Sequence, residues 1–442
     1  GHWWGGRLAG KPPASALAWT GGALLAAAVT TSGAIFVLPA VAGPVLNSVA
    51  DPVWAITALT ALAFFLPSFF AGVPSPVLAP IAVTTQEGSG PALGAMFASG
   101  AVGAIAGTLL AGFVFIAWLG STLTLVVVTL VYVASGLLCF WLGRSRGMLL
   151  AVATGVAATG LAGIALSAPP QCQVESRHFC LRVEVLSPDP VNPVRLMVLD
   201  HLAHGIGAAQ MPMTQFTEHT AMLDALARLR APRPEFTSFH IGGGTYSVPR
   251  AFATRGAGPI TVAEIDPAVT QMAVESFWFD PETATVLHED ARRALLTRPD
   301  DRYDVILGDA FTDVVVPVHL ITQEFFQLAR DRLTPGGTFL MNVIDYEDRL
   351  RAVSSVVATL QEVFPVVEVW THQVPPVPGS RMVFVVVAGD APTPADSIHV
   401  PAPEVMRFGA LADGMGRQLA DTRGLILTDD FAPIDRLMGR LD

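Results

Sequence analysis

The first 170 residues of this 442-residue chain contain almost no charged side chains. Only six are present, two acidic and four basic: Asp51, Glu87, Arg7, Lys11, Arg144 and Arg146. A soluble helical bundle would need a charged outer face, so this scarcity excludes that class of fold. The remainder carries 22 basic and 35 acidic residues of the chain's 26 and 37. Its acidity argues against binding of nucleic acid, which requires a basic surface.

Cysteine is scarce as well, with three residues in the chain. Cys172 and Cys180 lie close together in QCQVESRHFC, but no second Cys or His pair has the spacing of metal ligands. We therefore expect no metal site. The two thiols either form a disulfide or stay reduced, and the sequence leaves both alternatives open.

Long apolar runs fill the first part of the chain: residues 16–38, 53–73, 92–116, 122–142 and 148–166. A helix needs roughly 20 apolar residues to cross the hydrocarbon core of a bilayer. We predict a transmembrane helical domain of about five spans over residues 1–168, with the lipid bilayer as its partner. Its small residues favour close helix contact, for instance at Gly103 and Gly107.

The basic residues of this part precede the first span or lie between the fourth and the fifth. Four crossings separate the two groups, so both fall on one side, as the positive-inside rule requires. The second part of the chain then lies on the non-cytoplasmic side of what we expect to be a bacterial inner membrane. The supply of the cofactor inferred below favours the cytoplasm instead, and the side stays open.

After Pro169-Pro170 short β-like runs appear, followed by alternating strands and helices. We expect a small β segment at 171–215 and an α/β domain with a mostly parallel sheet at 216–442. Ligands of such sheets bind at the carboxyl ends of the strands, where the strand order reverses. The strand ends carry the following residues: Gly242, Gly243, Gly244, Glu264, Asp290 and Asp309. The glycine turn lacks the lysine of a phosphate-binding P-loop. The acidic residues at the strand ends also suit a cationic sulfonium better than a pyrophosphate.

Six motifs resemble, in order, those of the polyamine aminopropyltransferase (spermidine synthase) superfamily: GGGTYSVPRAFA, VAEIDPAV, EDARRAL, YDVILGDAF, HLITQEFF and LTPGGTFLMNV. Three further stretches resemble its membrane-fused members: LTDDFAPID at 427–435, WWGGRLAGKPP at 3–13, and residues 90–115. The resemblance implies a class I methyltransferase-like (Rossmann-type) fold and a transferase. It also implies about two spans before Gly1, and it allows a homodimer.

The implied co-substrate is S-adenosylmethionine or its decarboxylated form, without a metal. By this resemblance Gly242, Gly243 and Gly244 approach the thioether side of the co-substrate. Glu264 holds the ribose hydroxyls, and Asp290 holds the adenine amine.

Asp309 and Asp313 match the catalytic loop, where a carboxylate orients and deprotonates the attacking amine. Three residues are further candidates for contact with the acceptor: His204, Asp429 and Asp430. His204 is equally interpretable as a surface-loop histidine, and the two aspartates as a helix cap.

The chain departs from the spermidine-forming members at the amine pocket. Thr245 replaces their Asp after the glycines, the loop at 309–313 is DAFTD rather than D-S-S-D-P, and TQFTEHT at 214–220 matches D-E-F-x-Y-x-E weakly. A polyamine needs several carboxylates along its channel. We therefore expect a small-molecule or lipid acceptor other than ordinary putrescine.

Three functions fit these observations. The first is a membrane-bound, spermidine synthase-like transferase. The second is an S-adenosylmethionine-dependent methyltransferase acting on a lipid or membrane-borne acceptor. The third is a non-catalytic ligand sensor or transporter-like protein, which ranks lowest because transporters usually place ionisable residues inside their spans.

Overall fold

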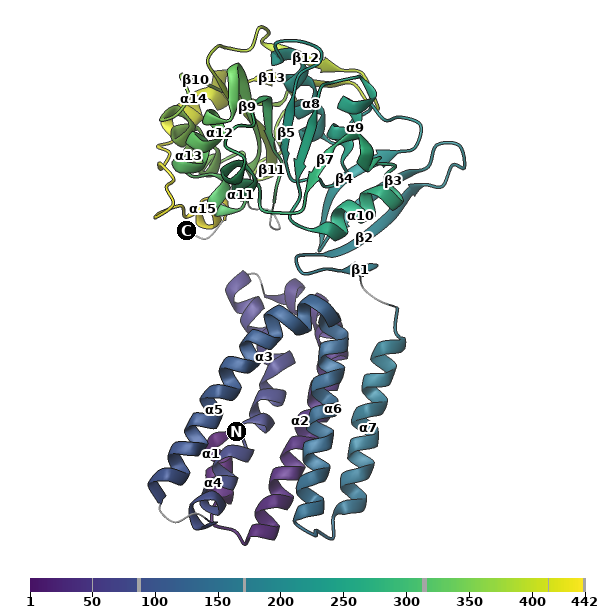
Figure 1. The fold of residues 1–442 in the computed structure, drawn as a ribbon, viewed down its shortest axis with the longest axis vertical. Coiled ribbons are helices and arrows are strands. Elements are labelled where there is room, and N and C mark those ends of the chain that lie inside the picture. The colour runs from purple at the N-terminus through teal and green to yellow at the C-terminus, as the bar shows by residue number, and fades with distance from the viewer. Residues whose placement is uncertain (50, 86–88, 170–171, 312–315, 412, 440–442) are drawn as a thin grey trace. The chain divides into compact units, whose positions relative to one another are not determined.

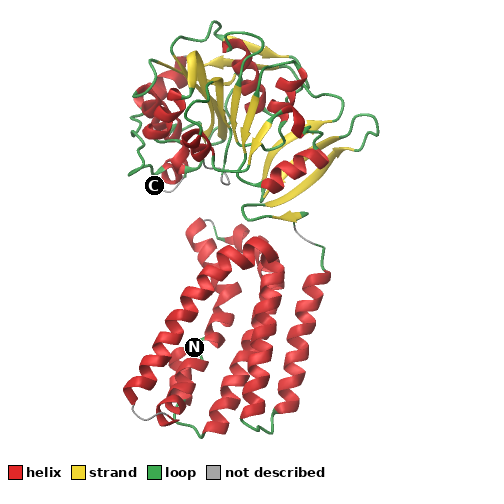
Figure 2. Ribbon diagram, in the orientation of Figure 1, coloured by secondary structure: helices red, strands yellow, loops and turns green. Residues whose placement is uncertain are grey.

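A computed structural model describes residues 1–49, 51–85, 89–169, 172–311, 316–411 and 413–439. The chain forms two compact units, Gly1–Gln171 and Cys172–Asp442, which we call the helical unit and the α/β unit. Figure 1 and Figure 2 show helices alone in the first unit and a helix-flanked sheet in the second.

The helical unit contains these elements: α1 (His2–Leu8), α2 (Pro13–Ser48), α3 (Pro52–Ala71), α4 (Pro74–Thr85), α5 (Ser89–Leu110), the π-helical η1 (Ala111–Leu119), α6 (Gly120–Leu142) and α7 (Met148–Ser167). Among the described residues, four helical runs are long and apolar enough to cross a membrane: Pro13–Ser48, Val53–Val83, Gly90–Leu142 and Met148–Ser167. The third run holds two of the five predicted spans. The chain reverses direction within it near Gly120, which takes a φ of 72° (Figure 1).

Small residues set the closest helix contact of this unit, but at positions other than those expected. A Cβ added at Gly136 of α6 would lie 2.8 Å from the Leu25 side chain of α2, and one at Gly21 would lie 2.8 Å from the Gly136 carbonyl oxygen. The predicted contact at Gly103 and Gly107 does not form with any described residue of this chain, because a Cβ at either would meet no described atom within 4 Å. Their helix, α5, contacts α4 and η1 instead.

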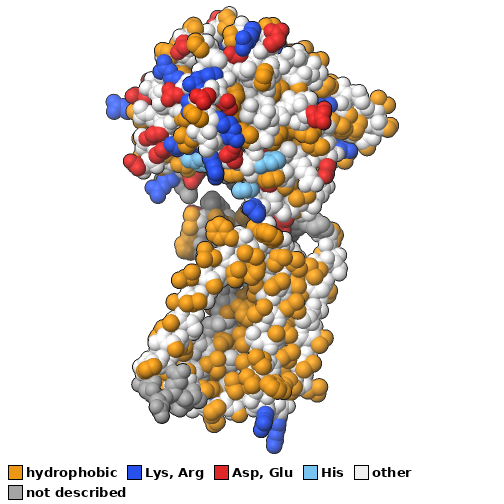
Figure 3. Space-filling model, in the orientation of Figure 1, with side chains coloured by type: hydrophobic (Ala, Val, Ile, Leu, Met, Phe, Trp, Pro, Cys, Tyr) orange, Lys and Arg blue, Asp and Glu red, His pale blue; other side chains and the backbone are white. Residues whose placement is uncertain are grey.

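The outer surface of the helical unit is apolar. Large hydrophobic side chains such as Phe97, Phe113 and Trp118 are at least 71% exposed. Figure 3 shows hydrophobic side chains over much of the visible face of this unit, whereas charged side chains are scattered over the visible face of the α/β unit. Such a surface is suited to lipid and not to water.

The α/β unit begins with a small antiparallel sheet in the order of its strands: β1 (Val174–Glu175), β2 (Cys180–Ser187), β3 (Val194–Leu199) and β4 (Leu202–Ala208). A disulfide joins Cys172 to Cys180 across a Cα–Cα distance of 5.1 Å and closes the β1–β2 hairpin. Of the two states that the sequence leaves open for these cysteines, the structure therefore has the bonded one.

The large sheet has the order β12-β13-β10-β11-β9-β8-β5-β6-β7. Its strands are β5 (Ser238–Ile241), β6 (Ile260–Ala263), β7 (Thr285–Leu287), β8 (Tyr303–Gly308), β9 (Leu333–Tyr346), β10 (Val366–His372), β11 (Arg381–Gly389), β12 (Ser397–Val400) and β13 (Met406–Ala410). From β7 to β9 neighbouring strands are parallel, and β11 is antiparallel to β9. The strand order reverses between β5 and β8, so a ligand crevice is expected at their carboxyl ends.

Helices cover both faces of this sheet (Figure 2). They are α8 (Glu218–Arg230), α9 (Ser247–Thr254), α10 (Pro267–Ser276), α11 (Ala291–Thr297), α12 (Gln323–Asp331), α13 (Arg351–Gln361), α14 (Asp413–Asp421) and α15 (Ile434–Met438), with 3-10 turns η2 (Pro281–Thr283) and η3 (Val318–Leu320). Alternate residues of each central strand enter two separate cores, as Ile306 and Leu307 do. Burial on both faces explains why these strands read as continuous apolar runs.

Candidate active site

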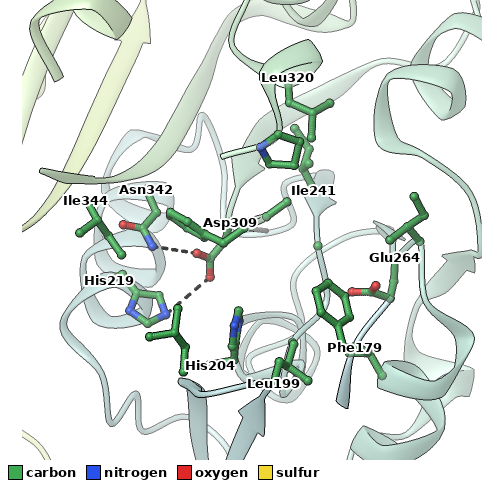
Figure 4. Close-up of a pocket in the computed structure, with 18 of the residues that line it drawn as sticks. Phe179, Leu199, His204, His219, Ile241, Glu264, Asp309, Leu320, Asn342 and Ile344 are labelled. Carbon is green, nitrogen blue, oxygen red and sulfur yellow. Dashed lines mark hydrogen bonds and ion pairs between the residues drawn. The ribbon is translucent and has the colours of Figure 1, made fainter. Parts of the chain in front are cut away.

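A cavity of about 830 Å³ runs along the carboxyl ends of the strands in the α/β unit. Its floor crosses from β7 through β6, β5 and β8 to β9 and β11. The small sheet and the start of α8 contribute the remaining lining, which includes Phe179, Leu199 and His204 (Figure 4). We call the part lined by β5, β6 and β7 the β7 half, and the part lined by β9, β11 and α8 the β11 half.

The glycine turn brings the ends of β5 and β8 into contact. Gly242 and Gly244 have φ values of 89° and 51°, which side chains rarely adopt. A Cβ at Gly242 would lie 2.7 Å from the carbonyl oxygen of Asp309. Glycine is therefore required at the point where the strand order reverses.

Glu264 follows β6, and its side chain forms a hydrogen bond with the backbone of this turn. Its carboxylate accepts hydrogen bonds from the backbone N–H of Gly243 at 2.8 Å and of Asp266 at 2.9 Å. The side chain is only 6% exposed but lines the cavity. Burial raises the pKa of Glu264, and the backbone hydrogen bonds partly offset that rise.

Asp290 follows β7 and caps α11, accepting a hydrogen bond from the backbone N–H of Arg293 at 2.9 Å. Its second oxygen lies 2.6 Å from Nε2 of His319, on the turn η3. Burial acts to raise the pKa of Asp290, but the bonds from His319 and Arg293 outweigh it and leave the pKa lowered. Asp290 thus presents an ionised carboxylate to the cavity.

Asp309 follows β8, midway along the cavity floor. Nδ2 of Asn342, on β9, donates to one carboxylate oxygen at 2.9 Å. Nε2 of His219, in the first turn of α8, lies 3.7 Å from the other oxygen (Figure 4). Oδ1 of Asn342 is buried and has no hydrogen-bond partner among the described residues. An unsatisfied buried acceptor beside a carboxylate indicates a place for a ligand N–H or O–H group.

The β11 half continues away from Asp309 with different chemistry. Ile344, Met382 and Val383 give it apolar walls. Glu218 is paired with His372 at 2.8 Å. The exposed Arg381 lines the cavity at the start of β11, and its guanidinium forms no ion pair with any described residue.

The structure gathers most of the residues singled out from the sequence around this cavity: Gly242, Gly244, Glu264, Asp290, Asp309 and His204. Gly243 lies behind the turn and contributes its N–H to Glu264. Asp313 lies outside the described residues.

Asp429 and Asp430 do not line the cavity, and neither caps a helix. Both are exposed in the turn bridged by Thr428 and Phe431, and Arg292 binds both carboxylate oxygens of Asp429 at 2.6 Å. The salt bridge fastens the C-terminal segment to α11. The position of Asp429 and Asp430 outside the cavity therefore does not support their interpretation as contacts of the acceptor.

Sequence reasoning missed His219 and Asn342. Both stand in motifs that the sequence analysis quoted, TQFTEHT and LTPGGTFLMNV. Only the pairing of β8 with β9, and the packing of α8 over β9, bring them to Asp309. Among the described residues, no group of three or more His, Cys, Asp or Glu side chains has the arrangement of a metal site.

Comparisons with known proteins find similar sequences and a similar solved structure. The family described as "Spermine/spermidine synthase domain" matches residues 241–396. A polyamine aminopropyltransferase of Vibrio vulnificus is 29% identical over 224 residues, which cover 47% of this chain and 71% of that protein. An N-terminal histidine N-methyltransferase of Emericella nidulans is 32% identical over 130 residues, which cover 28% of this chain and 23% of that protein. A probable spermidine synthase from Corynebacterium glutamicum has a similar solved structure, with a TM-score of 0.49, 20% identity, and coverage of 58% of this chain and 96% of that one.

Proposed function

We propose that the protein is a transferase that uses a sulfonium nucleoside, on the premise that residues 241–396 match the spermine/spermidine synthase domain. The donor is S-adenosylmethionine or its decarboxylated form, and the acceptor is an amine. The observation that carries the proposal is the position of Asp309, between a carboxylate-rich β7 half and an apolar β11 half.

The chemistry of the β7 half fits this donor. Glu264 offers carboxylate oxygens to a ribose diol, and Asp290 offers an ionised carboxylate to an adenine amine. No Lys or Arg is among the described residues that line this half, whereas Glu264, Glu289 and Asp290 are. Such a donor set favours a cationic group and disfavours a pyrophosphate, which needs positive charge or a helix N-terminus.

The residues around Asp309 perform the remaining tasks. Bound in the β7 half, a sulfonium nucleoside supplies an electrophilic carbon and leaves as a neutral thioether. Asp309 and Asn342 hold the attacking nitrogen in line with that carbon, which replaces a bimolecular encounter by a positioned one. The carboxylate of Asp309 also stabilises the positive charge that develops on the nitrogen.

The acceptor is not ordinary putrescine in this proposal. Spermidine-forming members carry an Asp at the position of Thr245. The Thr245 side chain is neutral and buried, and it packs against Gly205. Arg381 places a positive charge in the β11 half, with its guanidinium 5.2 Å from the centroid of the Tyr346 ring. A dication would need a second free carboxylate there, but Glu218 is already engaged by His372.

A methyl transfer is the second candidate. Without a carboxylate at Thr245, the site does not repel the carboxylate that S-adenosylmethionine has and its decarboxylated form lacks. The relative from Emericella nidulans is itself an N-methyltransferase by name. Under this reading a lipid or other membrane-borne amine receives the methyl group.

The helical unit anchors the enzyme in a lipid bilayer in this proposal, on the strength of its long runs and exposed apolar surface. The disulfide Cys172–Cys180 and the positions of the basic residues support a non-cytoplasmic α/β unit. The supply of S-adenosylmethionine supports the cytoplasm. The alkylation experiment described in the Discussion distinguishes the two sides.

The product of the reaction tests the proposal. Purified protein in detergent or nanodiscs is incubated with each donor and a panel of amines: putrescine, spermidine, and vesicles of phosphatidylethanolamine. Release of methylthioadenosine identifies aminopropyl transfer, and release of adenosylhomocysteine identifies methyl transfer. Binding of both nucleosides without any release would instead support a ligand sensor.

A further inference from the structure

His219 is a titratable group that lies against the carboxylate oxygen of Asp309 that Asn342 does not bind, with Nε2 of His219 3.7 Å from Oδ2 of Asp309. It belongs to the first turn of α8, whose start packs over β9 and β11 and lines the cavity. Its side chain is 16% exposed and that of Asp309 is 28% exposed. Both are therefore sheltered yet reachable from the cavity.

Nε2 of His219 offers a lone pair to the cavity in the tautomer that carries its proton on Nδ1. Thr217 Oγ1 lies 3.5 Å from it but only 2.7 Å from Oγ1 of Thr220. Because the Thr220 hydroxyl donates to the Thr217 carbonyl at 3.1 Å, the Thr217 hydroxyl is free to donate to Thr220 at the shorter distance. In that tautomer the Nε2 lone pair receives no hydrogen bond from Thr217 and faces the cavity beside Asp309.

We propose that His219 is the general base that removes the proton from the attacking amine, with Asp309 as its electrostatic partner. This inference rests on the proposed function. An amine nitrogen placed about 3 Å from both Asp309 Oδ2 and His219 Nε2 forms a triangle with them, since those two atoms are 3.7 Å apart. The buried, unpartnered Oδ1 of Asn342 supplies a third acceptor for its N–H groups.

The step balances with these groups alone. The nitrogen lone pair forms the new N–C bond, and the electrons of the broken C–S bond stay on sulfur. One N–H proton passes to Nε2 of His219, which becomes an imidazolium, and later to solvent. The carboxylate of Asp309, 3.7 Å from Nε2, stabilises this imidazolium.

Titratable side chains of neighbouring elements surround His219. The titratable groups around it are Asp309 after β8, His204 on β4, and Glu218 on its own helix, which is paired with His372 of β10. A group that can accept a proton within hydrogen-bond reach of the attacking amine meets the geometric requirement for a general base.

The test uses the full chain in nanodiscs and the amine of the panel above that the wild type turns over fastest. His219→Gln, which keeps a polar group of similar size, should lower kcat by about 100-fold or more. The affinity for methylthioadenosine and adenosylhomocysteine should stay within twofold. Added imidazole should restore activity to His219→Ala, and the acidic limb of the kcat–pH profile should be lost in both variants. His399→Gln, on the exposed edge strand β12, is the matched control.

Each outcome decides the matter. A His219→Gln variant that keeps the wild-type kcat and pH profile would overturn the assignment of the base while leaving the transferase intact. Loss of activity without rescue by imidazole in His219→Ala, accompanied by weaker nucleoside binding, would show a structural role and would also overturn it. Absence of turnover by the wild type with every amine would overturn the proposed function and this inference together.

Discussion

Replacement of Glu264 tests two roles that its position implies, binding of the nucleoside and support of the glycine turn. Its carboxylate is buried, pins the glycine turn through the N–H groups of Gly243 and Asp266, and faces the cavity. A hydrogen bond to a charged group contributes about 1.5–3 kcal/mol, and about 1.4 kcal/mol corresponds to a tenfold change in affinity. Glu264→Ala should therefore weaken nucleoside binding by about 10- to 100-fold.

The same substitution should also destabilise the protein without ligand. Two buried backbone N–H groups lose their acceptor, at a cost of about 1–3 kcal/mol each. Part of this loss is offset, because burial raises the pKa of Glu264 and its ionised form is unfavourable in the fold. Because the pKa of Glu264 is higher in the folded than in the unfolded state, the free energy of unfolding of the wild type should decline as the pH rises from the unfolded pKa to the folded pKa. The Glu264→Ala variant should lack this decline.

A matched control distinguishes binding from stability. Asp345 is another buried carboxylate whose pKa burial raises, and it accepts the N–H groups of Tyr346, Ala352 and Val353 away from the cavity. Asp345→Ala should lower the unfolding midpoint but leave affinity for methylthioadenosine and adenosylhomocysteine unchanged in calorimetry. If Glu264→Ala behaves like Asp345→Ala, Glu264 only supports the turn and the ribose assignment is refuted.

Three further predictions concern other parts of the α/β unit. Cys172 and Cys180 should resist alkylation in intact membranes until reductant is added; ready labelling without reductant would place the unit in the cytoplasm. Purified protein given putrescine and decarboxylated S-adenosylmethionine should release little methylthioadenosine, and robust release that Asp309→Asn abolishes would show that the amine pocket accepts a diamine. Nucleoside binding needs ionised Asp290, whose pKa is lowered, so it should fail only as the pH falls below the usual range of an aspartate. In His319→Ala the loss should occur at higher pH, and an unmoved titration by calorimetry would refute this role of the pair.

Much of this organisation was predictable because local patterns encode it. The uncharged apolar runs, the alternation of strands and helices, and the ordered motifs predict the fold class, a transferase and a resemblance to spermidine synthases. The spermine/spermidine synthase domain model matches residues 241–396, and a polyamine aminopropyltransferase is 29% identical over 224 residues. Glycines with positive φ and acids at strand ends are positions that the topology itself demands. They are therefore readable before any contact is known.

The rest depends on contacts that no local pattern contains. His219 and Asn342 reach Asp309 only through the packing of α8 and the register of β8 with β9. Asp429 looks like a site residue in LTDDFAPID, yet its distant partner Arg292 makes it part of a structural salt bridge. Gly103 and Gly107 have the spacing of a helix contact, but α5 presents them to open space.

The central claim, that the β7 half binds a sulfonium nucleoside, is tested most directly by a thermal-shift screen of the purified full chain. The ligands are S-adenosylmethionine, its decarboxylated form, methylthioadenosine and adenosylhomocysteine, with ATP as the pyrophosphate-containing control. A ligand that binds only the folded state raises the midpoint by mass action, with about 2.7 kcal/mol of stabilisation at 100 times its Kd. We predict stabilisation by one donor and its matching product, and none by ATP. Stabilisation by ATP alone, or by no nucleoside at all, would contradict the account.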